Sequence, residues 1–232
     1  MSGTRLNVSL AKYAIGLTGA IPGRESWSEP AMDRAILEFI ALLSGIVFKY
    51  GGRIVHGCHP TFTPIILHQA RLHATPNGSP KPVTLIMSEL WAKNLPGDYR
   101  ESIAGVAEFF VTKQIGEGGP EVPETRNYSL TEMRQLLIKS QNVMVAVGGK
   151  MHKKDGLIPG VQEEMDLAAK QDIPRFLVAG MGGYASEYAR VLTPSSLRNG
   201  LTDEQNALLF STPDVSACVN VIFEQLVRQS RG

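Results

Sequence analysis

The sequence predicts an α/β fold, a three-layer α/β/α sandwich built around a mainly parallel sheet. Short apolar runs alternate with longer segments of helical period, which is typical of a parallel sheet covered by helices. The run Val143–Val147 is apolar at every position, and such a strand is buried on both faces. Most runs end in glycine or a small polar residue, so the carboxyl ends of the strands are expected to share one polar edge. Together these features define a single Rossmann-like sandwich.

Six strands are expected, at residues 14–20, 53–56, 83–87, 108–112, 143–147 and 175–180. The first long helix begins after Ser28-Glu29-Pro30 and ends at Gly51-Gly52, since proline favours a first turn and glycine a C-terminus. Further helices are expected at 63–73 and 102–107, from 129, from 159–160, from 202 and from 212–214. The helix at 129 opens with a capping box, Ser129-Leu130-Thr131-Glu132, and residues 115–127 are interpreted as a mobile surface loop.

Length and composition indicate one soluble domain spanning residues 1–232, with the helices at 202–230 covering the sheet or forming an oligomer contact. The formal net charge is +1, from 23 basic and 22 acidic residues, which makes a nucleic-acid partner unlikely. Two cysteines without metal-type spacing fit a reducing compartment. Because no signal peptide or membrane span is visible, we expect a cytoplasmic protein without a membrane partner.

The first strand closes with Thr18-Gly19, and the loop after it carries Arg24. Gly16, Gly19 and Gly23 do not form the Gly-x-Gly-x-x-Gly fingerprint, which argues against a dinucleotide dehydrogenase. Arg24 is either a ligand-binding side chain or a solvated loop charge.

The loop after the second strand carries Gly57, His59 and Thr61 just before a helix. Hydroxyl and amide donors at such a position suit a phosphate. His56, Cys58 and His59 also suggest zinc, but zinc needs three or four converging ligands and no second cluster supplies them. We therefore predict no metal and no cofactor. His59 is interpreted either as a donor to a ligand phosphate or as a structural loop residue.

The fifth strand ends in Gly148-Gly149-Lys150, and Pro159-Gly160 opens the next helix. Helical spacing buries Val161 and Met165, places Glu164 at the border of the buried stripe and points Glu163 away. Glycines at a strand end let a phosphate approach the backbone, and an acid in the first turn can accept hydrogen bonds from ribose hydroxyls. The alternative is that Gly-Gly only turns the chain and that the acids only favour the helix N-terminus.

Arg134 on the preceding helix, Gly148-Gly149 and Pro159-Gly160-Val161-Gln162-Glu163-Glu164 resemble the signature of the SLOG superfamily. That superfamily contains the Lonely Guy phosphoribohydrolases, the DNA-processing protein DprA and nucleotide-sensing domains of antiphage systems such as Thoeris. In Lonely Guy enzymes an arginine and a Pro-Gly-Gly-x-Gly-Thr-x-x-Glu run carry the site, and Arg134 and Glu164 fall on the matching positions. Here residues 150–158 split the glycine run and Val161 replaces threonine, which weakens a transfer of catalytic activity more than a transfer of ligand binding.

The resemblance implies two functions. As a sensor in bacterial antiphage signalling, the chain would bind ADP-ribose or cyclic ADP-ribose, and its readout would need an effector protein or a homo-oligomer. As an N-glycosidase, it would use Glu164 and Arg134 on a nucleoside 5′-monophosphate. A scaffold without chemistry is the third possibility. The ligand-binding candidates are Thr18, Gly19, Arg24, Gly57, His59, Thr61, Arg134, Gly148, Gly149, Lys150, Gly160, Glu164 and Gly182. In the sensor, Lys150 and the glycine loops would hold phosphates, Arg134 would pair with a phosphate and Glu164 would bind ribose hydroxyls.

Overall fold

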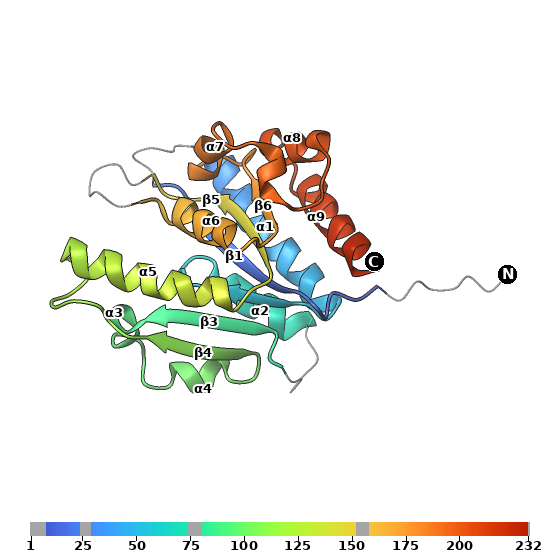
Figure 1. The fold of residues 1–232 in the computed structure, drawn as a ribbon. Coiled ribbons are helices and arrows are strands. Elements are labelled where there is room, and N and C mark those ends of the chain that lie inside the picture. Colours follow the sequence, from blue (N-terminus) through green and yellow to red (C-terminus); the bar gives the residue numbers. More distant parts are fainter. Residues whose placement is uncertain (1–7, 24–28, 74–79, 152–157, 232) are drawn as a thin grey trace.

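The structure is a computed structural model that describes residues 8–23, 29–73, 80–151 and 158–231. Within these residues six strands form one all-parallel sheet in the order β4-β3-β2-β1-β5-β6 (Figure 1). The strands are β1 (Ala14–Ala20), β2 (Arg53–His56), β3 (Val83–Ser88), β4 (Ala107–Thr112), β5 (Val143–Gly148) and β6 (Arg175–Val178). The predicted α/β fold with a parallel sheet is confirmed.

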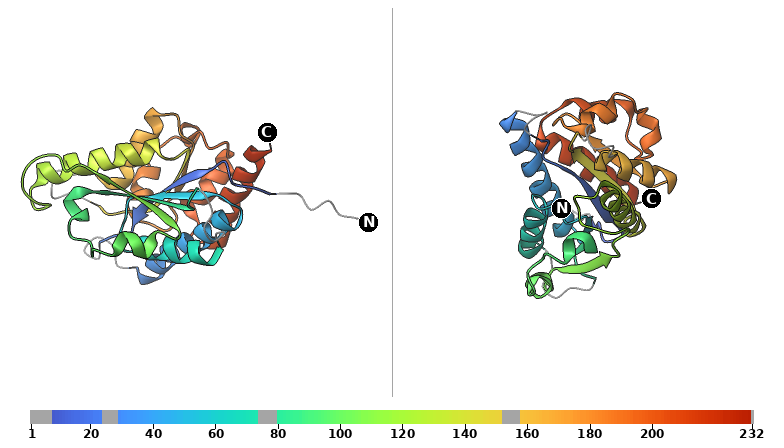
Figure 2. Two further views of the ribbon diagram at one scale, coloured as in Figure 1. Left: turned by 90° about the horizontal axis from the view of Figure 1, so that it is seen from below. Right: turned by 90° about the vertical axis from the view of Figure 1, so that its left-hand side faces the viewer.

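Helices cover both faces of the sheet, so the fold has three layers (Figure 2). One face carries α1 (Pro30–Lys49), α2 (Thr63–His73), α8 (Asp203–Ser211) and α9 (Val215–Ser230). The other carries α5 (Pro123–Lys139), α6 (Gly160–Lys170) and α7 (Tyr184–Ala189). Short helices α3 (Glu89–Ala92) and α4 (Tyr99–Ile103) flank β3 and β4, and a 3₁₀ turn spans Pro194–Leu197. None of the described helices is both long and apolar enough to cross a bilayer.

The position of strand β5 inside the sheet, between β1 and β6, explains why its sequence is an uninterrupted apolar run. All of its residues are buried, because successive side chains point to opposite helical layers. Val145 and Val147 join the core under α1 and α9, whereas Met144 and Ala146 join the core under α6 and α7. A strand covered on both faces has no solvent side on which a polar residue would be favoured.

The sheet changes direction between β1 and β5. The chain builds β1 to β4 outward on one side, then returns through α5 to place β5 on the other side of β1. The connections that leave β1 and β5 therefore diverge to opposite faces. This switch point opens a crevice beyond the carboxyl ends of the two strands, which is where open α/β sheets bind ligands.

The expected start of α5 is wrong. The helix begins at Pro123, not at Ser129, and proline at the first position is favoured because its missing N–H is not needed there. Ser129 lies inside the helix, and its hydroxyl accepts a hydrogen bond from Ile115 N at 2.9 Å. The Ser129 side chain, which the local pattern predicted to cap the helix, therefore makes a tertiary contact instead. Residues 123–127, which were predicted to lie in a loop, are helical.

The C-terminal helices begin where expected. Thr202 forms a capping box with Gln205 at the start of α8, and Asp214 accepts a hydrogen bond from Ala217 N at 2.9 Å at the start of α9. The apolar side of α9 packs into the core beside α1. This side of the helices therefore covers the sheet layer, and an oligomer contact through their outer faces stays a prediction.

Candidate functional site

A cavity of about 550 Å³ lies beyond the carboxyl ends of β1, β2 and β5, at the switch point of the sheet. Its volume falls in the range of small-molecule sites, roughly 300–1,000 Å³. The structure brings most of the predicted binding residues together in its lining. These are Thr18, Gly19, Gly57, His59, Arg134, Gly149, Lys150, Gly160 and Glu164.

Three further candidates lie outside this lining. Thr61 is exposed and outside the lining, because its N–H turns back to His59 Nδ1 at 3.3 Å. Gly148 lies behind Gly149, and Gly182 lines a separate depression of about 400 Å³. Arg24 lies outside the described residues. The loop after β2 therefore offers fewer free donors than expected, since the amides of Phe62 and Thr63 also bond within it, to His59 O.

Gly148 and Gly149 allow the chain at the end of β5 to pack closely against β1 and α6. Gly148 and Gly149 have φ of +64° and +101°, a region that favours glycine. A Cβ at Gly149 would lie 2.6 Å from Val161 Cγ2, and one at Gly148 would lie 2.5 Å from Ala20 O. Gly149 N donates to Ala20 O at 2.7 Å, so this amide is not available to an anion. The expectation that the glycine loop holds a phosphate is corrected for the amide of Gly149.

The N-terminus of α6 supplies amides that the glycine pair does not. The bond from Glu163 N to Pro159 O at 3.1 Å is the first of the helical pattern, so the amides of Gly160, Val161 and Gln162 precede the helical ladder. The N-cap residue, Pro159, has no side chain that could bond to these amides. Gly160 and Val161 line the cavity together with Lys150. Amide dipoles and a lysine thus place positive potential at one end of the cavity.

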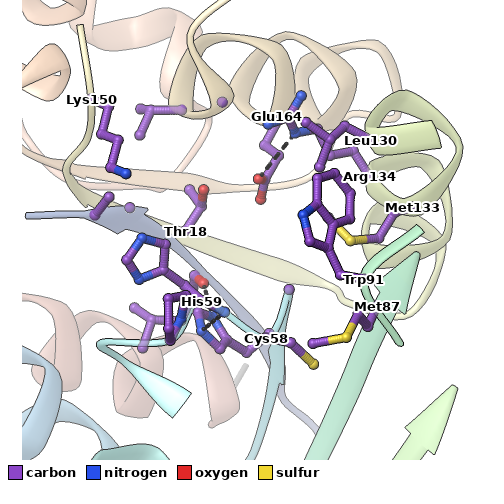
Figure 3. A pocket seen from close by; sticks show the side chains of 18 of the residues that line it. Thr18, Cys58, His59, Met87, Trp91, Leu130, Met133, Arg134, Lys150 and Glu164 are labelled. Atoms are coloured by element: carbon purple, nitrogen blue, oxygen red, sulfur yellow. Dashed lines mark hydrogen bonds and ion pairs between the residues drawn. The ribbon is translucent and has the colours of Figure 1, made fainter. Parts of the chain in front are cut away.

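Arg134 and both glutamates of α6 form one cluster, of which Figure 3 shows Arg134 and Glu164. Arg134 Nη1 pairs with Glu163 Oε2, and Arg134 Nε lies 3.6 Å from Glu164 Oε1. Glu163 Oε1 also accepts a hydrogen bond from Thr131 Oγ1 at 2.5 Å. The prediction that Glu163 points away is wrong, because α5 packs beside the first turn of α6 and occupies the side that helical spacing assigned to solvent.

Glu164 lies between the two ends of the cavity, next to Arg134 (Figure 3). Burial raises the pKa of its carboxyl group above the ordinary value of 4.5, while the charge of Arg134 and a hydrogen bond from Thr18 act against that rise. A carboxyl group with a perturbed pKa in a cleft, beside a cation, is typical of functional sites.

His56 at the end of β2 and His59 in the loop after it are held in neutral forms. His56 Nδ1 bonds to Leu17 O at 2.8 Å and His56 Nε2 accepts from His59 N at 3.2 Å, so the proton sits on Nδ1. Burial lowers the pKa of His56 to about 4. Burial and the charge of Lys150 lower the pKa of His59 to about 4. In the described parts of the chain, no three His, Cys, Asp or Glu residues are grouped to hold a metal.

An apolar wall at the other end of the cavity was missed by sequence reasoning. Figure 3 shows Trp91, Met87 and Met133 on the side away from Lys150, with Leu130 beside them. The spacing of Leu130 and Met133 is equally typical of residues on the core-facing side of a helix, and Trp91 sits on a four-residue helix too short for a periodic signal. The aromatic side chain of Tyr128, at the same end of α5, is 61% exposed and outside the lining.

The fold and the cavity define an α/β protein of Rossmann-like architecture with a ligand site at the switch point of its sheet. Residues 24–209 match the SLOG cluster2 family, and the chain belongs to this family. Among solved structures, the X-ray structure of TM1055, a structural genomics target, is similar with a TM-score of 0.51 and 16% identity, covering 84% of this chain and 88% of that chain. None of the curated proteins compared matches the chain.

Proposed function

We propose that the chain binds a nucleotide derivative of the ADP-ribose or cyclic ADP-ribose type in the cavity at the switch point. Membership of the SLOG superfamily suggests nucleotide-related binding or N-glycosidase activity. The observation that carries the proposal is the polarity of the cavity: Lys150 and the α6 amides at one end, Glu164 and Arg134 between, and Trp91 at the other end.

The phosphate end of the proposed ligand lies at Lys150 and the first turn of α6. Lys150 forms no ion pair with another described residue, so its charge is available to an anion. His59 protonates with a pKa near 4 and is neutral at pH 7. Its Nδ1 accepts from Thr61 N, which leaves the proton on Nε2 as a donor. Thr18 also lines the cavity, and its hydroxyl group bonds to Glu164.

The ribose and the base occupy the rest of the cavity in this proposal. The Glu164 carboxyl group accepts hydrogen bonds from ribose hydroxyls, as an acid near a nucleotide does in other α/β sites. The indole of Trp91 and the thioethers of Met87 and Met133 form an apolar wall, and aromatic and thioether groups contact a base favourably.

The proposed role is that of a sensor. The resemblance to sensory SLOG domains supports a function in antiphage signalling, in which an effector protein or a second copy of the chain responds to binding. The split glycine run and Val161, which is buried where the Lonely Guy motif has threonine, favour binding without turnover.

An N-glycosidase acting on a nucleoside 5′-monophosphate is the second candidate, and the Arg134–Glu164 pair favours it. In such a reaction the bond between ribose C1′ and the base nitrogen breaks, water adds to C1′, and the base leaves with a proton. Glu164 would stabilise the cationic ribosyl group or accept the proton of the attacking water.

One experiment separates the two functions. The purified protein is incubated with AMP, NAD and the cyclic ADP-ribose isomers, while base release is followed by chromatography and ligand binding by thermal shift. Stabilisation with intact ligand supports the sensor. Base release that Glu164→Gln abolishes supports the enzyme. Neither response with any of these compounds rejects both and leaves the scaffold.

A further inference from the structure

The position of Arg134 leaves little room for a ligand phosphate. Its Nη1 is paired with Glu163, and its Nε faces Glu164 at 3.6 Å. On the remaining side, Gly160 is so close that a Cβ there would lie 2.7 Å from Arg134 Nη2. A phosphate at this guanidinium would meet two carboxyl groups that already compete for its charge.

Glu163 is itself held from two sides. One carboxylate oxygen accepts from Thr131 Oγ1 at 2.5 Å and the other pairs with Arg134. Thr131 and Arg134 are three residues apart on α5, so both face the same direction. The side chains of Arg134 and Glu163 are only 11% and 15% exposed, and a charge-assisted pair shielded from water in this way is stronger and better ordered than one on the surface.

A second observation points toward the cavity. Among the described residues, Arg134 Nε is buried without a hydrogen bond of normal length, and its contact with Glu164 Oε1 is an ion pair at 3.6 Å. Buried donors are seldom left unpaired, so this N–H is available to the group that Glu164 binds. The guanidinium is paired closely with Glu163 and only by a longer contact with Glu164, and a ligand hydroxyl group at Glu164 would complete that longer contact.

We propose that Glu163 and Thr131 are positioning residues that fix Arg134 against Glu164, so that Arg134 and Glu164 together bind a sugar hydroxyl and the phosphate binds only at Lys150 and the N-terminus of α6. This inference rests on the proposed nucleotide ligand. It departs from the role that the resemblance implied for Arg134, which was to pair with a phosphate.

The test uses isothermal titration calorimetry with AMP, adenosine and 2′,3′-dideoxy-AMP on the full chain. The phosphate ratio is the Kd of adenosine divided by that of AMP, and the hydroxyl ratio is the Kd of dideoxy-AMP divided by that of AMP. In Glu163→Gln the hydroxyl ratio is expected to fall about tenfold, the effect of losing a charge-assisted hydrogen bond, while the phosphate ratio is unchanged. In Lys150→Met the phosphate ratio falls and the hydroxyl ratio is unchanged.

Matched variants separate positioning from folding. Thr131→Ser keeps the hydroxyl group that Glu163 accepts from and retains the wild-type hydroxyl ratio, whereas Thr131→Val lowers it. This pair carries the test if Glu163→Gln does not fold. Glu132→Gln removes an exposed carboxylate on the same helix and changes neither ratio.

Two results overturn the inference. If Arg134 is a phosphate ligand restrained by Glu163, then Glu163→Gln releases it and the phosphate ratio rises. If Glu163 has no positioning role, the hydroxyl ratio is the same in wild type and in the Glu163 and Thr131 variants. Wild-type protein that does not bind AMP overturns the nucleotide proposal itself and the inference with it, which is a different outcome from a misassigned arginine.

Discussion

Glu164 lies in the candidate site, and burial of its charged carboxyl group lowers the stability of the folded protein. Its carboxyl group is buried enough that its pKa rises above 4.5 in the folded state even though Arg134 lies beside it. For an acid whose pKa is raised on folding, the unfolded state loses its proton first. Stability therefore falls as the pH rises from about 4.5 through the folded-state pKa, and the penalty is complete above that value.

Glu164→Gln is expected to be more stable than wild type at pH 7, because a neutral amide does not carry this penalty. The difference should shrink as the pH is lowered toward 4 and below, where both states of the wild type are protonated. Urea unfolding across this pH range measures it. Glu132→Gln is the control for loss of an exposed carboxylate, and a Glu164→Gln protein that is less stable than wild type at pH 7 would contradict the assignment.

The glycine at the end of β5 gives a second prediction for a single residue. Gly149→Ala places a Cβ 2.6 Å from Val161 Cγ2 at a φ of +101°. The backbone conformation alone is expected to cost about 1–3 kcal/mol, and displacement of Val161 adds to it. Gly97→Ala is the matched control, since nothing lies within 4 Å of a Cβ there. Equal denaturant midpoints for the two variants would refute the packing role.

At the scale of elements, strands were easier to predict than helix ends. Strand β5 is a continuous apolar run, and the interior positions of β1 and β2 are also buried between the two helical layers. The start of α5 was misplaced because Ser129-x-x-Glu132 satisfies a local capping pattern, while the hydroxyl of Ser129 is used by Ile115. The main chain at residue 115 is fourteen residues away, so no local rule indicates that contact.

The last helix has a clear structural role that can be measured. Ile222 on α9 is fully buried in the core that α9 shares with α1. Ile222→Ala is expected to lower the free energy of unfolding by about 2–5 kcal/mol, the usual cost of such a cavity. Glu224→Ala on the exposed side of the same helix is expected to change it by less than about 0.5 kcal/mol. Similar losses for both would place the packing face of α9 elsewhere.

The candidate site shows where sequence reasoning stops. Residues that follow strands β1, β2 and β5 were found, because parallel strands bring their carboxyl ends to one edge. The direction of Glu163 and the wall around Trp91 were not found, because they depend on how α5 lies against α6 and on a helix of four residues. Tertiary contacts determine how one helix lies against another in a layer. The periodicity of a single segment does not predict those contacts.

The molecule as a whole is expected to respond to a ligand as one unit. The cavity is lined from β1, from α3 and α5, and from the start of α6, so segments from both sides of the switch point contact the same ligand. AMP at about one hundred times its Kd should raise the free energy of unfolding by about 2.7 kcal/mol. In calorimetry this appears as one transition that moves upward, consistent with the predicted single domain. A ligand that splits the transition in two would contradict that prediction.

The imidazole of His56 fixes the position of the loop after β2 at the edge of the cavity. Its two nitrogens bond to the carbonyl of Leu17 and to the amide of His59. The ring therefore links β1 to the loop after β2, where the hydrogen bonds between the two strands have ended. The spacing of three residues between positions 56 and 59 is therefore a fixed length. Lengthening that segment by one residue would detach it from its neighbour even though every residue of the sheet stayed the same.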